Sequence, residues 1–144
     1  MIIQYVKGNI FDSPAKVLVN PVNTVGVMGK GLALQFKNRY PEMFKKYKEQ
    51  CVLGNLFIGE LMLVHEQDHD ILLFPTKKDW RSPSEISYIK AGLQKLYLTH
   101  KRYNYESIAF PKIGCGCGGL DWNDVKPLME KYLNAIPIPV MIYE

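Results

Sequence analysis

The chain has 144 residues, of which 47% are hydrophobic and 22% charged, and its formal net charge at pH 7 is +4. It is too apolar to be disordered, and its length supports a core without disulfides or metals, so we expect a single domain over residues 1–144. No apolar run is long enough for a membrane span, and the first residues, MIIQYVKG, resemble an amphipathic strand rather than a leader peptide. Three cysteines, an odd number, suit reduced thiols in a reducing compartment. We therefore expect a cytoplasmic protein.

Short apolar runs alternate with amphipathic stretches along the first half of the chain, without repeats or low-complexity linkers. We predict strands over residues 2–7 and 17–19, and a helix over residues 30–40 whose apolar residues share one face. Proline tolerates the first turn of a helix, so Pro41 is expected to begin a second helix that ends near Cys51.

In the second half, residues 60–65 and 70–74 predict a hairpin or two neighbouring strands. Residues 82–85, with the sequence SPSE, match a capping box with proline at the first helical position, so a helix is expected to start there. We also predict a buried strand over residues 107–110, a helix capped by Asp121, and a last strand over residues 138–143.

Strands that alternate with helices and lack a polar face predict an α/β fold, with helices on both sides of a mostly parallel sheet. Such sheets bind ligands in the crevice beyond the carboxyl ends of their strands. Two glycine-rich segments follow strands in this way, VNPVNTVGVMGKG (residues 19–31) and PKIGCGCGGL (residues 111–120). We therefore expect both segments at this crevice.

Glycine lets backbone N–H groups approach a ligand, and consecutive N–H groups in a tight loop bind anions. The loop over residues 114–119 is expected to run into a helix N-terminus, so a pyrophosphate suits it, and the first loop could grip it from the other side. The alternative is that both segments are only tight turns. Neither segment is a known nucleotide-binding motif. The acidic residue that follows the glycines of a Rossmann site is absent after Gly114, Gly116 and Gly119, and GVMGKG lacks the Ser or Thr of a P-loop.

Cysteines, histidines and lysines are the remaining candidates for chemistry. The chain has no C-x-x-C pair and no histidine pair at ligand spacing, so we expect neither a metal nor a cofactor. No histidine lies near Cys115 in the sequence to activate it. Lys77, in FPTKKDWRSPSE, should emerge at the crevice, and a partly desolvated lysine beside a second cation, Lys78, could act as a nucleophile. The alternative is two surface lysines.

Four segments resemble the landmarks of the macro domain family over nearly the whole chain: VKGNIF, LVNPVNTVGVMGKGLALQFKNRYP, FPTKKDWR and PKIGCGCGGLDW. The chain is most similar to the branch that contains terminal ADP-ribose glycohydrolases and the DNA ADP-ribosyl glycohydrolase antitoxins of DarTG systems. The resemblance implies a three-layer α/β/α sandwich with a mixed, mostly parallel sheet, and ADP-ribose as the ligand. We expect no further domain of the kind that some antitoxin relatives carry, and so no direct neutralisation of a toxin.

The resemblance also implies roles for individual residues. Asn9 and Ile10 would contact the adenine, the loop over residues 114–119 would wrap the pyrophosphate, and residues of the first loop would surround the distal ribose. The expected ADP-ribose contacts are Asn9, Ile10, Asn20, Asn23, Met28, Gly29, Lys30, Gly31, Thr76, Ile113, Gly114, Cys115, Gly116, Cys117, Gly118 and Gly119.

In this branch the lysine that matches Lys77 is catalytic, either attacking the anomeric carbon of the distal ribose or otherwise opening that sugar, so that the modified group is released. The aspartate of terminal glycohydrolases, expected just after the G-C-G turn, is replaced here by Cys117 and Gly118. This difference favours the DarTG-like subgroup, whose second loop has a similar G-C-G-x-G-G-L-D-W form and whose substrate is ADP-ribose on a DNA base.

Three functions remain open at this point: a glycohydrolase that removes mono-ADP-ribose from DNA bases or acidic protein side chains, a non-catalytic ADP-ribose-binding module, and an ADP-ribose 1″-phosphate phosphatase. The expected partners are ADP-ribose and ADP-ribosylated DNA or protein, and we expect a monomer. Trp80 could stack on a nucleic acid and Arg81 could contact a phosphate, the alternative for Trp80 being a lid over the ribose.

Overall fold

The computed structural model describes residues 3–144, whose strands form a six-stranded sheet in the order β1-β6-β5-β2-β4-β3. The strands are β1 (Ile3–Val6), β2 (Val17–Asn23), β3 (Met62–His65), β4 (Asp70–Lys77), β5 (Ile108–Phe110) and β6 (Val140–Tyr143). Neighbouring strands pair in parallel except β3, which runs antiparallel to β4. The predicted mixed, mostly parallel sheet is confirmed, although Ile2 of the predicted first strand lies outside the described residues.

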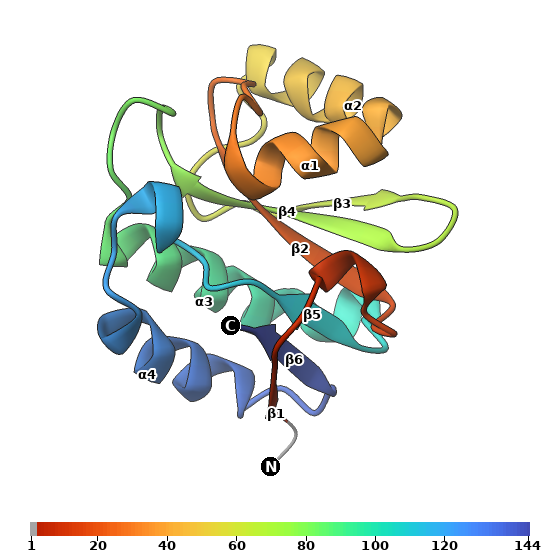
Figure 1. Cartoon of the computed structure of the whole chain (residues 1–144), viewed down its shortest axis with the longest axis vertical. Coiled ribbons are helices and arrows are strands. Elements are labelled where there is room, and N and C mark those ends of the chain that lie inside the picture. The colour runs from red at the N-terminus through yellow and green to blue at the C-terminus, as the bar shows by residue number, and fades with distance from the viewer. Residues whose placement is uncertain (1–2) are drawn as a thin grey trace.

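Within residues 3–144, four α-helices cover the sheet, two on each face (Figure 1). One face carries α1 (Gly31–Arg39) and α2 (Pro41–Val52), and the other carries α3 (Ile86–Tyr103) and α4 (Trp122–Leu133). Two short 3-10 helices, η1 (Ile10–Asp12) and η2 (Gly116–Gly118), lie in the connections. The expected three-layer α/β/α sandwich is therefore confirmed. In this part of the chain no helix is both long and apolar enough to cross a membrane.

Each face of the sheet has its own hydrophobic core. Phe36 of α1 and Tyr47 of α2 are fully buried on one face, and Ile89 of α3 and Val125 of α4 are fully buried on the other. A parallel strand covered on both faces needs apolar side chains on both of its faces. The central strand β4 meets this requirement, since residues 71–74 are fully buried.

Strands β2 and β4 are longer than predicted. The sequence prediction ended them at Val19 and Phe74, whereas each strand continues through a proline, Pro21 in β2 and Pro75 in β4. Proline lacks the N–H that a central strand donates to its neighbour. In the structure, β5 pairs with β2 only at Val17 and Leu18, and β3 pairs with β4 no further than Leu73. Each proline therefore lies where its strand has a partner on one side only, so a missing N–H is tolerated there.

The capping box predicted at residues 82–85 is wrong. Helix α3 begins at Ile86, its N-cap residue is Glu85, and no side chain caps it. Instead, Ser84 donates its hydroxyl to the Thr76 carbonyl at the end of β4 and its backbone N–H to the Gly118 carbonyl in η2. These two bonds hold the chain before α3 against two other segments, so tertiary contacts rather than a local cap decide where the helix starts.

Helix α3 lies so close to β4 at Gly92 that a Cβ there would collide with the fully buried ring of Phe74. The ring has no free space to move into, so overpacking outweighs the better helix propensity of alanine. We expect Gly92→Ala to lower the free energy of unfolding by about 1–3 kcal/mol in urea denaturation. Ser87→Ala, on the exposed face of the same helix, should change it by less than about 0.5 kcal/mol. Equal stabilities of the two variants would contradict this close contact.

Candidate functional site

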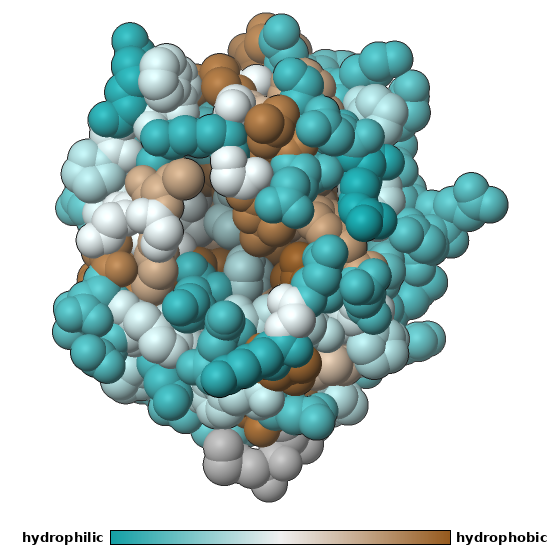
Figure 2. Space-filling view, viewed as in Figure 1, coloured by the Kyte–Doolittle hydropathy of each residue, from teal (hydrophilic) through white to brown (hydrophobic). Residues whose placement is uncertain are grey.

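A cleft of about 420 Å³ lies at the edge of the sheet where the parallel strands end. Its lining comes from residues at the ends of β2, β4, β5 and β6, from the loops that follow them and from the start of α1. In the space-filling view a hollow opens between the two helical layers, with hydrophilic side chains along much of its rim (Figure 2). This is the place where parallel α/β sheets bind ligands.

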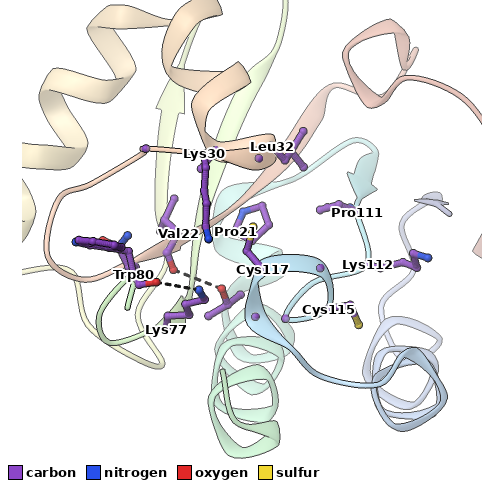
Figure 3. A pocket seen from close by; sticks show the side chains of 18 of the residues that line it. Pro21, Val22, Lys30, Leu32, Lys77, Trp80, Pro111, Lys112, Cys115 and Cys117 are labelled. Carbon is purple, nitrogen blue, oxygen red and sulfur yellow. Dashed lines mark hydrogen bonds between the residues drawn. The ribbon is translucent and has the colours of Figure 1, made fainter. Parts of the chain in front are cut away.

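Most of the residues expected to contact a ligand line this cleft. Figure 3 shows Lys30, Lys77 and Cys117, from three segments far apart in the sequence, around one space. The expected residues in the lining are Asn23, Gly29, Lys30, Gly31, Thr76, Lys77, Trp80, Gly114, Cys115, Gly116, Cys117 and Gly118.

Four other expected residues lie outside the lining. Asn9 caps η1, with its Oδ1 accepting the Phe11 N–H at 3.0 Å, and Gly119 ends η2 in the left-handed conformation. Ile10 and Ile113 are buried in the two cores, and the cluster of Ile10 also contains the cleft residue Tyr143. The roles of these four residues as ligand contacts stay predictions.

Asn20 and Met28 are buried and are likewise absent from the lining. The Asn20 Nδ2 lies 3.8 Å from the Met28 Sδ, while the Asn20 Oδ1 has no hydrogen-bond partner among residues 3–144. A buried acceptor without a donor costs about 1–3 kcal/mol, so a water or ligand donor at Oδ1 would be stabilising. Contact of these two residues with a ligand also stays a prediction.

Asn23, the last residue of β2, holds the first loop in shape. Its Oδ1 accepts the N–H groups of Val25 at 3.1 Å and Val27 at 3.3 Å, and its Nδ2 donates to the Val27 carbonyl at 2.7 Å. The Tyr47 hydroxyl lies 2.8 Å from both the carbonyl oxygen and the Oδ1 of Asn23. Burial raises the pKa of Tyr47, so the hydroxyl keeps its proton as a donor. Asn23 therefore braces the loop from inside.

The helix N-terminus at the cleft belongs to α1, whereas the sequence pointed to the helix after residues 114–119. Lys30 is the N-cap residue of α1, no side chain caps the helix, and residues 31–33 line the cleft. By contrast, α4 is capped by Asp121, which accepts the Asn123 N–H at 2.9 Å. The first-turn N–H groups of α1, at the positive end of its dipole, are thus the ones available to an anion.

The second glycine loop closes against the first. Gly114 has a φ of +76°, and a Cβ there would lie 2.8 Å from side-chain atoms of both Ile89 and Leu120, so a larger residue does not fit. A Cβ on Gly31 would lie 3.3 Å from the Cys117 Sγ. Residues of the two loops are therefore in close proximity across the cleft.

Part of the second loop's hydrogen-bonding capacity is used internally. The N–H groups of Gly118 and Gly119 donate to the Cys115 carbonyl at 2.7 Å and 3.3 Å. Gly116 and Cys117 form the first turn of η2, where N–H groups have no partner inside a helix. These two N–H groups are the candidates in this loop for contact with a phosphate.

The cysteine and metal alternatives gain no support from the geometry. The Cys115 Sγ lies 3.7 Å from the Ile113 carbonyl, and burial raises the pKa of the Cys115 thiol, which disfavours the nucleophilic thiolate. Within the described part of the chain, no three His, Cys, Asp or Glu side chains gather where they could hold a metal ion.

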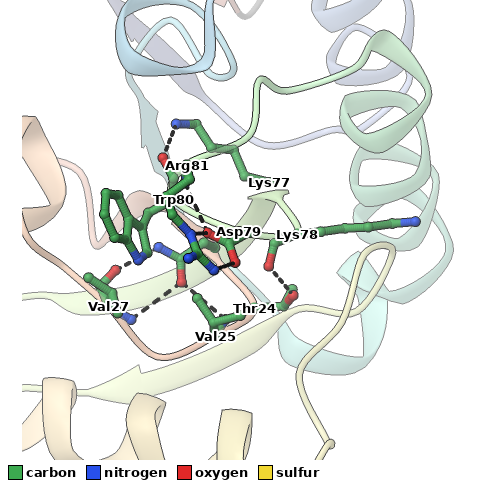
Figure 4. A network of polar contacts seen from close by, with 9 residues as sticks. Thr24, Val25, Val27, Lys77, Lys78, Asp79, Trp80 and Arg81 are labelled. Carbon is green, nitrogen blue, oxygen red and sulfur yellow. Dashed lines mark hydrogen bonds and ion pairs between the residues drawn. The ribbon is translucent and has the colours of Figure 1, made fainter.

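Lys77 is the last residue of β4 and pairs with Asn23 in the β2–β4 register. Its Nζ donates to the Trp80 carbonyl at 3.3 Å (Figure 4), and the Lys30 side chain extends from the opposite wall into the same space (Figure 3). Lys78 points the other way, with its Nζ 5.6 Å from the centroid of the Tyr88 ring. The cation that faces Lys77 across the cleft is therefore Lys30, and not the adjacent Lys78 as the sequence suggested.

The loop after β4 is held by an ion pair. Arg81 donates through Nε and Nη2 to the two Asp79 carboxylate oxygens at 3.0 Å and 2.7 Å (Figure 4). These hydrogen bonds from Arg81 lower the pKa of Asp79 to about 2, so the carboxylate stays charged at neutral pH. Trp80 lines the cleft but remains 48% exposed, and the Arg81 guanidinium lies 5.5 Å from its ring centroid.

The sequence interpretation missed several cleft residues. Pro111 and Lys112, which follow β5, lie at the end of the cleft away from Trp80 (Figure 3). The lining also includes Tyr143 and Glu144 at the end of β6, which lies beyond β5 in the sheet order. The predicted strands could have indicated the residues after β5 and β6, because the carboxyl ends of all parallel strands meet at one edge of a sheet. The other missed residues are Pro21, Val22, Val27, Leu32 and Ala33, next to positions that were expected.

Comparison with known proteins places this fold and site in a family. The family model described as Macro domain matches residues 19–129. The chain is 44% identical over 146 residues to the DNA ADP-ribosyl glycohydrolase of Mycobacterium tuberculosis, covering 98% of this chain and 42% of that protein. It is 41% identical over 147 residues to the DNA ADP-ribosyl glycohydrolase of Thermus aquaticus, covering 99% and 41%. The chain thus spans less than half the length of these curated relatives.

Solved structures agree with the sequence comparison. The macrodomain of Mycobacterium tuberculosis DarG has a TM-score of 0.94 at 44% identity, covering 98% of this chain and 96% of that one. The structure of Thermosipho africanus DarTG in complex with ADP-ribose has a TM-score of 0.93 at 38% identity, covering 98% of this chain and 41% of that one. The matched family model, the sheet order and the position of the cleft lead to one conclusion: the chain belongs to the Macro domain family.

Proposed function

We propose that the chain binds ADP-ribose in the cleft and hydrolyses the bond that joins ADP-ribose to a DNA base, with Lys77 as the catalytic residue. The observation that carries the proposal is the position of the Lys77 amine, on the cleft wall beside two loops suited to a diphosphate. The similarity to DNA ADP-ribosyl glycohydrolases, at 41–44% identity over almost the whole chain, supports this choice among the activities of the family.

An extended ligand with a central diphosphate suits the shape of the cleft. Its middle is bounded by the uncapped first turn of α1 and by the first turn of η2, both of which offer backbone N–H groups. Lys77 and Trp80 lie at one end, and Lys112 lies toward the other (Figure 3). We assign the distal ribose to the end with Lys77 and the adenosine to the end with Tyr143.

The reaction can be written with the groups of this chain. The neutral amine of Lys77 attacks the anomeric carbon of the distal ribose, and the bond from that carbon to the base breaks. The electron pair of that bond leaves with the base, which takes the proton that the Lys77 nitrogen loses after bonding to the carbon. Water then attacks this carbon, the bond from the carbon to the Lys77 nitrogen breaks, and a proton from the water restores the amine as free ADP-ribose leaves.

A carboxylate partner for Lys77 is not in place in the cleft. Among the described residues that line it, Glu144 has the one carboxylate side chain, and it comes from the end of β6 rather than from β4. Asp121 caps α4, and the Asp79 carboxylate is paired with Arg81. This arrangement supports chemistry that relies chiefly on the lysine, as the absence of the aspartate from the second loop already suggested.

Replacing Lys77 tests the catalytic assignment. Without the amine no adduct can form, so we expect Lys77→Ala to slow release of ADP-ribose from an ADP-ribosylated oligonucleotide by about 100-fold or more. Calorimetry should still detect ADP-ribose binding to this variant, since the loop backbones are unchanged.

Lys78→Ala is the matched control, because the neighbouring lysine points away from the cleft. Its release rate should equal that of the wild-type chain. Wild-type turnover in Lys77→Ala would refute the assignment. Tight ADP-ribose binding by the wild-type chain without turnover on DNA, protein or 1″-phosphate substrates would identify a binding module instead.

Tyr47→Phe tests whether the first loop must be held rigid. The change removes the donor to Asn23 and should lower the free energy of unfolding by about 0.5–1.5 kcal/mol in urea denaturation. We also expect weaker ADP-ribose binding by calorimetry, because the loop loses its hydrogen bond from Tyr47 of α2. Tyr97→Phe, at an exposed position of α3, should change neither quantity. Unchanged affinity in Tyr47→Phe would show that the loop does not depend on this contact.

A further inference from the structure

Apolar side chains are exposed at the end of the cleft that holds Lys77. Trp80 is 48% exposed, and Val25 and Val27 of the first loop are 48% and 37% exposed. Trp80 and Val27 both line the cleft, and Figure 4 shows both valines on the loop that faces Trp80. Exposed apolar groups gathered beside a polar cleft indicate a surface that another molecule covers.

The Trp80 ring is supported on its own loop. Arg81 lies 5.5 Å from the ring centroid, and its guanidinium is held in turn by both oxygens of Asp79. A third bond, from the Arg81 backbone N–H to the Asp79 Oδ1 at 3.0 Å, fixes the backbone of this turn. An aromatic ring braced in this way loses little freedom when a partner stacks on it.

The ion pair also bears on the role expected for Arg81. Its guanidinium is paired with Asp79 at 2.7 Å, and it is not among the residues that line the cleft. We assign Arg81 to the support of Trp80, and its contact with a phosphate stays a prediction.

Trp80 connects this surface to the reactive group. Its carbonyl accepts the hydrogen bond of Lys77 at 3.3 Å, while its ring is open to solvent. A group stacked on the ring therefore lies at a defined offset from the amine. The reaction requires the leaving group of the substrate to be positioned relative to the anomeric carbon, together with the substrate residues next to that group.

We propose that Trp80 is the DNA-binding element of this site, and that its indole stacks on a nucleobase at or next to the ADP-ribose linkage in a single strand. This inference rests on the proposed function. Base stacking on an aromatic side chain needs an open base face, which an intact duplex does not offer. Because the apolar indole of Trp80 lies next to the reactive amine, a nucleobase is favoured over a protein carboxylate as the leaving group.

The test compares Trp80→Ala and Trp80→Phe with the wild-type chain on an ADP-ribosylated single-stranded oligonucleotide. Loss of one stacked base corresponds to about 5- to 150-fold, so we expect KM to rise by about tenfold or more in Trp80→Ala, with a smaller change in kcat. Trp80→Phe should recover most of the loss. The dissociation constant of free ADP-ribose should stay within about twofold.

Phe57→Ala is the matched control, since this aromatic residue is 53% exposed and does not line the cleft. Its KM should be that of the wild-type chain. A second arm hybridises the modified oligonucleotide to its complement, and slower release from this duplex is expected.

Three results would overturn the inference while leaving the proposed function intact. In the first, KM on the oligonucleotide is unchanged in Trp80→Ala. In the second, ADP-ribose affinity falls by the same factor as KM rises, which would make the ring a lid over the ribose. In the third, the duplex is cleaved as well as the single strand. If the wild-type chain released no ADP-ribose from DNA, the proposed function would fail and this inference with it.

Discussion

The site depends on the parallel hydrogen bonding of β2 with β4. This ladder runs from Val17 and Asp70 to Asn23 and Lys77, with an irregularity just before Asn23. Because paired parallel strands end at the same edge, the ladder brings the residue that shapes the first loop beside the candidate nucleophile. A shift of this register by one residue would turn Lys77 to the opposite face of the sheet, so the chemistry depends on the ladder and not on the loops alone.

The loops around this ladder have separate tasks. The first loop is held from within by Asn23 and from α2 by Tyr47, and it delivers the uncapped start of α1 to the cleft. The second loop approaches it at Cys117, whose Sγ would lie 3.3 Å from a Cβ on Gly31, and Gly114 of the same loop packs where a side chain would collide with Ile89 and Leu120. Backbone N–H groups are thus the main candidates for anion binding, and Lys30, Lys77 and Lys112 are cations on the cleft wall.

The segment between β4 and α3 combines several features at one end of the cleft. Within a few residues it holds Lys77 on a backbone carbonyl, exposes an indole and pairs Asp79 with Arg81. Ser84 ties the far end of this segment to Thr76 and Gly118, so that it is anchored on both the strand and the second loop. In the function proposed above, the cleft of the family fold binds ADP-ribose, and this segment recognises the group to which ADP-ribose is attached.

The sequence alone determined the α/β class, the parallel character of the sheet and the edge where ligands bind, because hydrophobic periodicity and glycine-rich strand ends are local signals. It did not predict the extension of β2 and β4 through Pro21 and Pro75, since the neighbouring strands that leave one side unpaired are known only from the sheet order. Likewise, the sequence pattern predicts Ser84 as part of a helix cap, but in the structure Ser84 donates hydrogen bonds to the carbonyls of Thr76 and Gly118. Only the folded chain brings these partners together. The same holds for the cation that faces Lys77. Sequence adjacency suggested Lys78, but successive side chains of an extended chain point to opposite sides, and the fold brings Lys30 there instead.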